Sequence, residues 1–327
     1  MQKLIPSPLQ SGDEIRIIAP STGIKIIRAD CRQIAKQRFE AMGLKVSFGQ
    51  NTIDDNFDML GSSEIEKRAS DINDAFKDKN IKAIFTIIGG FNSNQVLPFL
   101  DYDLIKNNPK IICGFSDITA LLNGIYAQTG LIGFYGPHYS SIGMLKGCEY
   151  TIDYLQQILF SRSANIVPSN EWSDDLWFLD QEKREFIKND GWWIINDGIA
   201  KGELAGGNLS TYILLQGTPY RPQFSKDTIL MIEECNYSLA DDKEFLRQLQ
   251  SIAQRTDFSN IKALLIGRFQ KNSGISREKL EFILKNIPQL KGLPIIANID
   301  FGHTTPIATL PIGGNCEVTS QQIKVNW

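Results

Sequence analysis

The first half of the chain alternates short apolar runs with segments of helical periodicity. The apolar runs predict strands at 14–21, 44–50, 82–90, 110–115 and 132–137. The segments between them predict helices at 27–43, 63–76, 92–106 and 117–129. Apolar runs separated by helix-length segments are typical of a parallel sheet covered by helices on both faces. We therefore predict an α/β fold whose N-terminal part is a mostly parallel, doubly wound sheet.

One of these helices carries a start signal of its own. Ser63 and Glu66 have the S-x-x-E spacing of a capping box, in which the two side chains satisfy the free N–H groups of the first helical turn. We therefore expect the second helix to begin at this motif.

The pattern changes between residues 160 and 200, where the chain is polar and poorly periodic. Four of the five tryptophans lie in this segment: Trp172, Trp177, Trp192 and Trp193. We predict that the segment is a linker or insertion between two domains. The predicted parts are an N-terminal α/β domain at 1–160, an aromatic linker or insertion at 161–200 and a C-terminal domain at 201–327.

Alternation resumes in the last third of the chain. We predict a glycine turn followed by a helix at 202–217, strands at 227–234, 262–269 and 294–301, and helices at 240–254 and 276–287. The C-terminal residues predict short strands around a Gly-Gly turn. The second domain is therefore expected to be α/β with short β-strands.

Composition narrows the class of protein only a little. Hydrophobic residues make up 42% of the 327 residues and charged residues 22%, which is ordinary for a globular protein. A formal net charge of −3 gives no sign of a nucleic-acid partner. No run approaches the roughly 20 apolar residues that span a bilayer, and the N-terminus lacks the apolar core of a signal peptide. We expect a cytoplasmic protein that binds neither nucleic acid nor membrane.

The five cysteines are dispersed, with no CxxC pair, as expected for reduced core residues. Two distant histidines and scattered cysteines offer no ligand spacing for a metal. We therefore expect no metal and no other cofactor. A nucleotide-dependent transferase is disfavoured, because neither a GxGxxG nor a GxxxxGK[ST] motif stands between a strand and a helix.

Polar residues at predicted strand ends are the candidates for chemistry. The only two histidines, His138 and His303, each follow a strand end, and histidine is the usual general base near neutral pH. Ser116 stands where a strand gives way to a helix, and Glu233 and Glu234 close a very apolar strand. Ligands of parallel sheets bind beyond the C-terminal strand ends. A serine, a glutamate and a histidine there could form a nucleophile, an orienting group and a base.

Each candidate also has an ordinary structural explanation. Ser116 can serve as a helix cap, because Ser-Asp is a good helix start. A histidine at a strand end can be a hydrogen-bonded structural residue, and paired glutamates commonly mark a solvated strand end. Gly89 and Gly90 can form a simple turn, Asn208 can cap a helix, and the tryptophans can pack between domains. Position alone therefore leaves the chemistry open.

A series of short motifs favours catalysis. The stretch GFSDIT at 114–119 resembles the G-[YF]-S-D-x-T element of the LD-carboxypeptidase family of serine peptidases. Further motifs of that family occur in the expected order, at 87–90, 135–137, 206–209, 232–234 and 302–306. One such motif would be weak evidence, but the ordered set is specific. The resemblance covers nearly the whole chain, from Gly12 to Gly313.

The resemblance implies a role for each member of a catalytic triad. Ser116 would be the nucleophile, and the N-terminal domain the nucleophile domain. His303 would be the general base and then the general acid, while Glu233 would orient the imidazole. The family pattern selects Glu233 over Glu234, which spacing alone does not separate. Glu234 stands where an Asp is common in the family.

We expect three further groups of residues to support the reaction. Backbone N–H groups of Gly90 and Asp117 are expected to form the oxyanion hole, because a glycine admits the substrate and Asp117 opens a helix. Asn208 is expected to bind the carboxylate or the amine of the substrate. Trp177, with Trp172 as the second choice, is expected to stack on a planar group such as adenine.

The family has two branches that differ in substrate. One removes the terminal D-alanine of murein tetrapeptides. The other resembles the microcin C immunity peptidase, which cuts the link between an aspartyl group and a nucleotide phosphoramidate, and the stretches 171–178 and 207–211 resemble this branch. We therefore predict a peptidase for a small aminoacyl-nucleotide or peptide, with a murein LD-carboxypeptidase as the alternative. A non-catalytic α/β ligand-binding protein is the alternative from another class. The resemblance also implies a homodimer.

Overall fold

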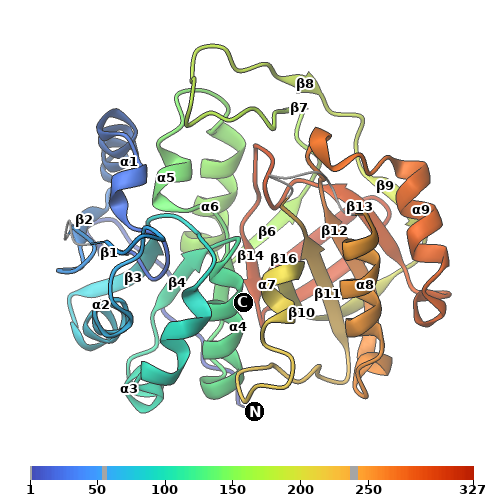
Figure 1. The fold of residues 1–327 in the computed structure, drawn as a ribbon, viewed down its shortest axis with the longest axis horizontal. Helices are drawn as coiled ribbons and strands as arrows, with labels where there is room; N and C mark the ends of the chain where they lie inside the picture. The colour runs from blue at the N-terminus through green and yellow to red at the C-terminus, as the bar shows by residue number, and fades with distance from the viewer. Residues whose placement is uncertain (1, 54–56, 236–241) are drawn as a thin grey trace.

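The computed structural model describes residues 2–53, 57–235 and 242–327, and in this part of the chain two large sheets stand side by side (Figure 1). The first sheet has the strand order β14-β5-β4-β3-β1-β2 and the second β6-β16-β15-β10-β11-β12-β13-β9. A small third sheet pairs β7 with β8. The protein is therefore of the predicted α/β class, with parallel strands at the centre of both large sheets.

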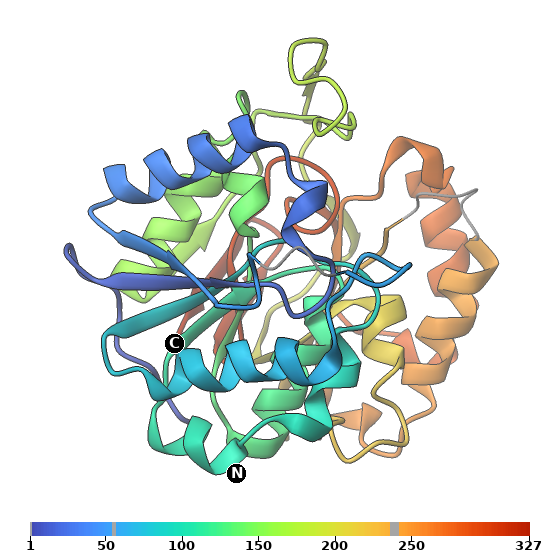
Figure 2. The same ribbon diagram turned by 60° about the vertical axis from the view of Figure 1, so that its left-hand side comes forward.

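The first sheet is parallel except at one edge. Its strands are β1 (Glu14–Ile18), β2 (Lys45–Phe48), β3 (Ile81–Thr86), β4 (Ile111–Gly114), β5 (Gly133–Tyr135) and β14 (Leu310–Ile312). The last of these pairs antiparallel with β5, although it comes from the C-terminal end of the chain. Its helices are α1 (Ala29–Ala41), α2 (Ile65–Lys77), α3 (Tyr102–Asn107), α4 (Ile118–Thr129), α5 (Tyr139–Ile142) and α6 (Glu149–Ser161). Helices α1, α5 and α6 cover one face and α2, α3 and α4 the other (Figure 2).

The second sheet has a parallel centre flanked by antiparallel strands. Its strands are β6 (Ser163–Ile166), β9 (Trp193–Asn196), β10 (Ala200–Asn208), β11 (Thr228–Glu233), β12 (Ile261–Gly267), β13 (Ile295–Ile299), β15 (Asn315–Thr319) and β16 (Gln322–Asn326). The remaining strands and helices are β7 (Glu171–Trp172), β8 (Ile187–Lys188), α7 (Leu209–Ile213), α8 (Asp242–Ala253) and α9 (Arg277–Lys285). The described residues also form the 3₁₀ turns η1 (Ile24–Ile26), η2 (Ser93–Phe99), η3 (Phe258–Asn260), η4 (Lys271–Ser273) and η5 (Pro288–Leu290). None of the helices in the described residues is long and apolar enough to cross a bilayer.

Helix α4 and a glycine turn join the two sheets. The side chain of Asn123 on α4 donates to the carbonyl of Gly206 on β10 (2.8 Å). The Gly-Gly turn at 313–314 leads from β14 in one sheet to β15 in the other, so it does not close a hairpin between paired strands. Leu204 on β10 exchanges two backbone hydrogen bonds with this turn. One buried core therefore extends across both sheets. The domain boundaries at 160 and 200 remain a prediction.

Three local predictions from the sequence were wrong. The glycines at 202–217 form no turn before a helix, since Gly206 and Gly207 lie inside the long strand β10. A Cβ on Gly206 would stand 2.0 Å from the carbonyl oxygen of Met231, so the missing side chain serves close strand packing. The capping box at Ser63 does not form, because α2 begins after Glu64 and no side chain caps it.

The third error is the continuous helix at 92–106, which is divided into η2 and α3. Pro98 lies in η2, and a proline has no N–H for the helical ladder. Asp101 then starts α3 by accepting a hydrogen bond from the backbone N–H of Leu104 (2.8 Å). The predicted start of the helix at 240 lies outside the described residues.

A buried ion pair holds the loop that follows β13. The guanidinium of Arg268 donates to Asp300 at 2.7 Å, and both side chains are almost fully buried. Asp300 also accepts hydrogen bonds from the backbone N–H and the hydroxyl of Ser169. This cluster therefore ties the start of the aromatic segment to the loop that carries His303.

We predict that Asp300→Asn lowers the free energy of unfolding by about 3 kcal/mol, because it leaves the guanidinium of Arg268 buried without a counter-charge. Chemical denaturation measures the change. The control is Glu317→Gln, which breaks an exposed ion pair with Lys201 and is expected to have no measurable effect. Equal stabilities of Asp300→Asn and wild type would contradict a structural role for the pair.

Candidate active site

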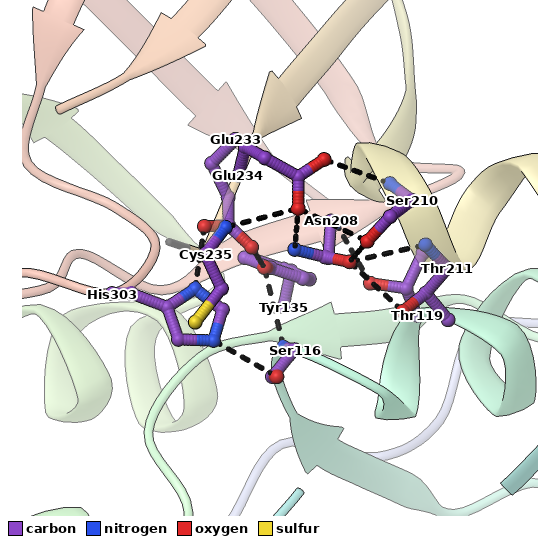
Figure 3. A network of polar contacts seen from close by, with 10 residues as sticks. All are labelled: Ser116, Thr119, Tyr135, Asn208, Ser210, Thr211, Glu233, Glu234, Cys235 and His303. Atoms are coloured by element: carbon purple, nitrogen blue, oxygen red, sulfur yellow. Dashed lines mark hydrogen bonds and ion pairs between the residues drawn. The ribbon is translucent and has the colours of Figure 1, made fainter. Parts of the chain in front are cut away.

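Three side chains from distant parts of the chain meet in a line at the C-terminal strand ends (Figure 3). Ser116 follows β4, Glu233 is the last residue of β11, and His303 lies in the loop after β13. The imidazole Nε2 of His303 stands 2.9 Å from the Oγ of Ser116. Its Nδ1 stands 2.7 Å from Oε2 of Glu233. These are hydrogen-bond distances at which a proton can pass between hydroxyl and imidazole.

Ser116 occupies a strained turn between β4 and α4. Its φ of +59° lies in the left-handed region, which residues other than glycine rarely adopt. The N-cap of α4 is Asp117, and no side chain caps this helix end. The hydroxyl of Ser116 faces His303 instead, so the side chain does not serve as an ordinary cap.

The two neighbouring glutamates face different partners. Glu233 is completely buried and points at His303. Glu234 turns toward the start of α7, where it accepts hydrogen bonds from the backbone N–H (3.1 Å) and the hydroxyl (3.0 Å) of Ser210. A strand places successive side chains on opposite faces, which explains the separation. Geometry therefore selects Glu233 as the partner of the imidazole.

The charges of the pair determine how it titrates. Burial, the largest effect, would lower the pKa of His303, but the adjacent carboxylate of Glu233 and the side chain of Cys235 together outweigh it and hold this pKa well above its ordinary value. Burial likewise acts to raise the pKa of Glu233, and the interaction with His303 reverses the shift and lowers it. Burial raises the pKa of Glu234, and the negative charge of Glu233 raises it further. The site therefore favours an ionised Glu233 beside the imidazole.

Tyr135 is a functional candidate that the sequence analysis did not single out. Its hydroxyl donates to Oε1 of Glu233 (2.6 Å) and accepts from the backbone N–H of Ser116 (3.3 Å). It therefore fixes the carboxylate and the turn at the same time. The signal was present in the family motif at 135–137, but nothing in the sequence shows that this tyrosine reaches a glutamate about a hundred residues away.

Two backbone N–H groups beside Ser116 are free to receive a ligand. In the described part of the chain, the N–H groups of Gly90 and Asp117 donate to no protein acceptor. Gly90 has a φ of +150°, and a Cβ there would meet the hydroxyl of Ser21 at 2.1 Å. The strand-end loop therefore requires glycine at this position.

A cavity of about 360 Å³ opens beside Ser116 and His303. Its lining is mostly apolar and includes Trp177 and Phe178 from the aromatic segment. This segment is joined to the His303 loop by two backbone hydrogen bonds between Ser173 and Thr305. The cavity is of the size that suits a small organic ligand.

Two predicted substrate-binding residues do not line this cavity. Trp172 lies over the guanidinium of Arg268, 5.2 Å from the ring centroid. Asn208 is the N-cap of α7, and its side-chain oxygen accepts from the backbone N–H of Thr211. Its side-chain N–H group points to Glu234 at 3.4 Å. Both side chains therefore have protein partners in this structure, and their contact with a substrate stays a prediction.

Comparison with known proteins agrees with the motifs. Residues 15–136 match the model of the LD-carboxypeptidase N-terminal domain, and residues 201–318 match that of the C-terminal domain. The chain is 49% identical to a putative carboxypeptidase, YocD, of Bacillus subtilis, with 95% of each chain covered. It is 33% identical to the microcin C7 self-immunity protein MccF of Escherichia coli, over 95% of this chain and 91% of that protein.

The same architecture occurs in solved structures. The crystal structure of an MccF-like protein from Bacillus anthracis superposes with a TM-score of 0.96 at 45% identity, and 99% of each chain is covered. Likeness of this extent covers both sheets and the loops between them. The chain belongs to the LD-carboxypeptidase family and is a hydrolase of the serine-peptidase type.

Proposed function

We propose that this protein hydrolyses a small aminoacyl-nucleotide of the microcin C type by a Ser-His-Glu mechanism. The observation that carries the proposal is the continuous line of hydrogen-bond contacts from Ser116 through His303 to Glu233. A nucleophile, a base and an orienting carboxylate in this arrangement define the triad by geometry, whatever their order along the chain.

The reaction proceeds in two halves. The Oγ of Ser116 attacks the acyl carbon of the substrate while its proton passes to Nε2 of His303. The C–N bond then breaks, and His303 gives that proton to the leaving nitrogen, which leaves an ester on Ser116. Water deprotonated by His303 hydrolyses the ester, releases the carboxylic acid and restores the hydroxyl. Glu233 stabilises the imidazolium in both halves.

The oxyanion of each tetrahedral intermediate would bind the N–H groups of Gly90 and Asp117. Both groups are without a protein acceptor in the described residues, and Asp117 stands at the positive end of α4. Losing one donor of this kind typically lowers the rate about 100- to 1000-fold.

The choice of substrate is supported by the aromatic cavity and by the relatives. Trp177 lines the cavity next to the nucleophile and offers a face on which a purine can stack. MccF, whose structure is similar at a TM-score of 0.88, has been solved in complex with aspartyl sulfamoyl adenosine. We propose the same class of ligand here, with the acyl group at Ser116 and the base at Trp177.

A murein peptide is the second candidate substrate. The chain is 27% identical to a probable murein peptide carboxypeptidase of Bacillus subtilis over 97% of its length. Hydrolysis of a murein tetrapeptide, with no hydrolysis of aspartyl-sulfamoyl adenosine, would favour this candidate.

The homodimer and the cytoplasmic location remain predictions. Sedimentation equilibrium tests the homodimer, and cell fractionation tests the location.

Ser116→Ala is expected to lower the rate of hydrolysis of aspartyl-sulfamoyl adenosine by about 10⁴-fold or more, because no other hydroxyl replaces the nucleophile. Release of aspartate, followed by chromatography, measures the rate. The control is Ser70→Ala on the exposed face of α2, which should match wild type. Retained turnover in folded Ser116→Ala would contradict the proposed nucleophile. If the wild-type protein hydrolyses neither candidate substrate, a non-catalytic ligand-binding protein becomes the better account.

The adjacent glutamates provide a matched pair of substitutions. Glu233→Gln removes the charge beside the imidazole and should lower kcat by about 10³- to 10⁴-fold. Glu234→Gln keeps groups that can bond to Ser210 and should change kcat by less than about tenfold. Steady-state kinetics of both variants make the comparison. A larger loss in Glu234→Gln would reverse the assignment.

The pH profile tests the electrostatics of the pair. His303 acts as a base only when neutral, and Glu233 raises its pKa. The rate kcat/KM should therefore fall on the acid side at a pH above the ~6.5 that is ordinary for histidine. Glu233→Gln lacks the negative charge that raises the pKa of His303, so the acid-side fall of kcat/KM should move to lower pH while the maximal rate also drops. If this fall stayed at the same pH or moved to higher pH, the result would argue against a charged Glu233.

A further inference from the structure

The second histidine, His138, is held rigidly at the wall of the same cavity. Its side chain is 2% exposed. The Nδ1 atom stands 2.7 Å from the hydroxyl of Thr86, and the ring of Phe115 stacks on the imidazole with centroids 4.3 Å apart. A ring fixed by a hydrogen bond at one end and by stacking on its face keeps one orientation.

The other ring nitrogen of His138 has no protein partner. Within the residues that the structure describes, Nε2 is buried and makes no hydrogen bond, although the residue lines the cavity. The large majority of buried side-chain polar atoms are hydrogen-bonded, because an unpaired one loses its bonds to water without replacement. An unpaired nitrogen beside a nucleophile therefore points to a contact with the ligand.

The hydrogen bonds of Thr86 determine what kind of contact this is. Its hydroxyl donates to the carbonyl of Cys113 (3.3 Å), so toward His138 it accepts, and the ring proton lies on Nδ1. Nε2 then carries a lone pair and is an acceptor. Burial and, second, the nearby His303 lower the pKa of His138 to about 3, which keeps the ring neutral and makes it a poor general base.

The space in front of this acceptor adjoins the nucleophile. An ideal Cβ on Gly89 would stand 3.3 Å from Nε2 of His138 and 3.2 Å from Oγ of Ser116, so both atoms lie on the same side of this residue. A glycine keeps that side free of a side chain, which leaves room for a ligand to approach both atoms.

The ring of Phe115 packs against both imidazoles, stacked on His138 and edge-on to His303. In the proposed mechanism the leaving nitrogen faces His303, which protonates it, and the oxyanion lies at the N–H groups of Gly90 and Asp117. We therefore assign the substituent that faces His138 to the acyl part of the substrate. The described lining of the cavity contains no Asp or Glu that could bind an ammonium group there.

We propose that His138 is a specificity-determining residue whose Nε2 accepts a hydrogen bond from the amino group on the acyl part of the substrate. The enzyme thereby selects aminoacyl substrates over acyl groups that lack the amine. This inference rests on the proposed peptidase function and adds to it the chemical class of the acyl group. A hydrogen bond from an ammonium donor is among the stronger ones, so one acceptor can discriminate appreciably.

Calorimetric binding to two ligands tests the proposal. The ligands are aspartyl-sulfamoyl adenosine and succinyl-sulfamoyl adenosine, which differ only by the amino group. They are titrated into Ser116→Ala, which prevents turnover, and into Ser116→Ala/His138→Phe, which keeps the ring stacking and removes the acceptor. With His138 present, the aspartyl ligand should bind about 10- to 100-fold more tightly than the succinyl ligand. In the His138→Phe protein this preference should disappear, with succinyl binding unchanged.

Two outcomes would overturn the proposal: the same preference in both proteins, or an equal loss for both ligands, which is what a purely structural role predicts. Nitrogen NMR of the imidazoles supplies a measurement that needs no ligand, and His138→Phe assigns the signals because the chain has only two histidines. A protonated Nδ1 and a bare Nε2 are expected, and a protonated Nε2 would refute the acceptor. If neither ligand binds, the nucleotide substrate of the proposed function fails, and the NMR result alone decides the case of His138.

Discussion

The arrangement depends on one carboxylate, that of Glu233, which is buried where the two sheets meet. A buried charge is costly unless it is paired and hydrogen-bonded. Tyr135 from the first sheet donates to one oxygen, and His303 lies against the other. A Cβ on Gly302 would stand 2.6 Å from that second oxygen, so glycine is needed for the carboxylate to fit. Because the carboxylate of Glu233 needs these hydrogen-bond partners, β5, β11 and the loop after β13 must meet at one place.

The same requirement organises the chemistry at Ser116. The hydroxyl of Tyr135 also accepts from the backbone N–H of Ser116, so the group that satisfies the carboxylate holds the strained turn. His303 is oriented by its contact with Glu233, and its other ring nitrogen, Nε2, then faces the serine. His138 is buried, no carboxylate among the described residues bonds to its ring, and burial lowers its pKa. The two histidines thus differ in their titration because their neighbours differ in charge.

The sequence predicted the parts of the fold that local patterns determine. The strands and most helices of the first half follow apolar periodicity. Ser116, Glu233 and His303 stand at predicted strand ends, but the family resemblance, and not position alone, predicts their roles. One prediction failed although its signal was local, since Pro98 divides the helix expected at 92–106. The error at Gly206 and Gly207 has a cause that lies far away along the chain. Gly206 and Gly207 looked like a turn because the close approach of Met231 and α4 is absent from the local sequence. The protein partners of Glu234, Trp172 and Asn208 are likewise set by tertiary packing, as are the contacts of Tyr135.

The central claim is that the buried carboxylate, through His303, makes Ser116 nucleophilic. Labelling with an aspartyl-like electrophile, followed by mass spectrometry of peptides, tests this most directly. The account predicts one adduct, on Ser116, which forms far more slowly when Glu233 is replaced by Gln. Equal labelling rates in the two proteins, or an adduct on another residue while Ser116 stays unmodified in the folded enzyme, would contradict it.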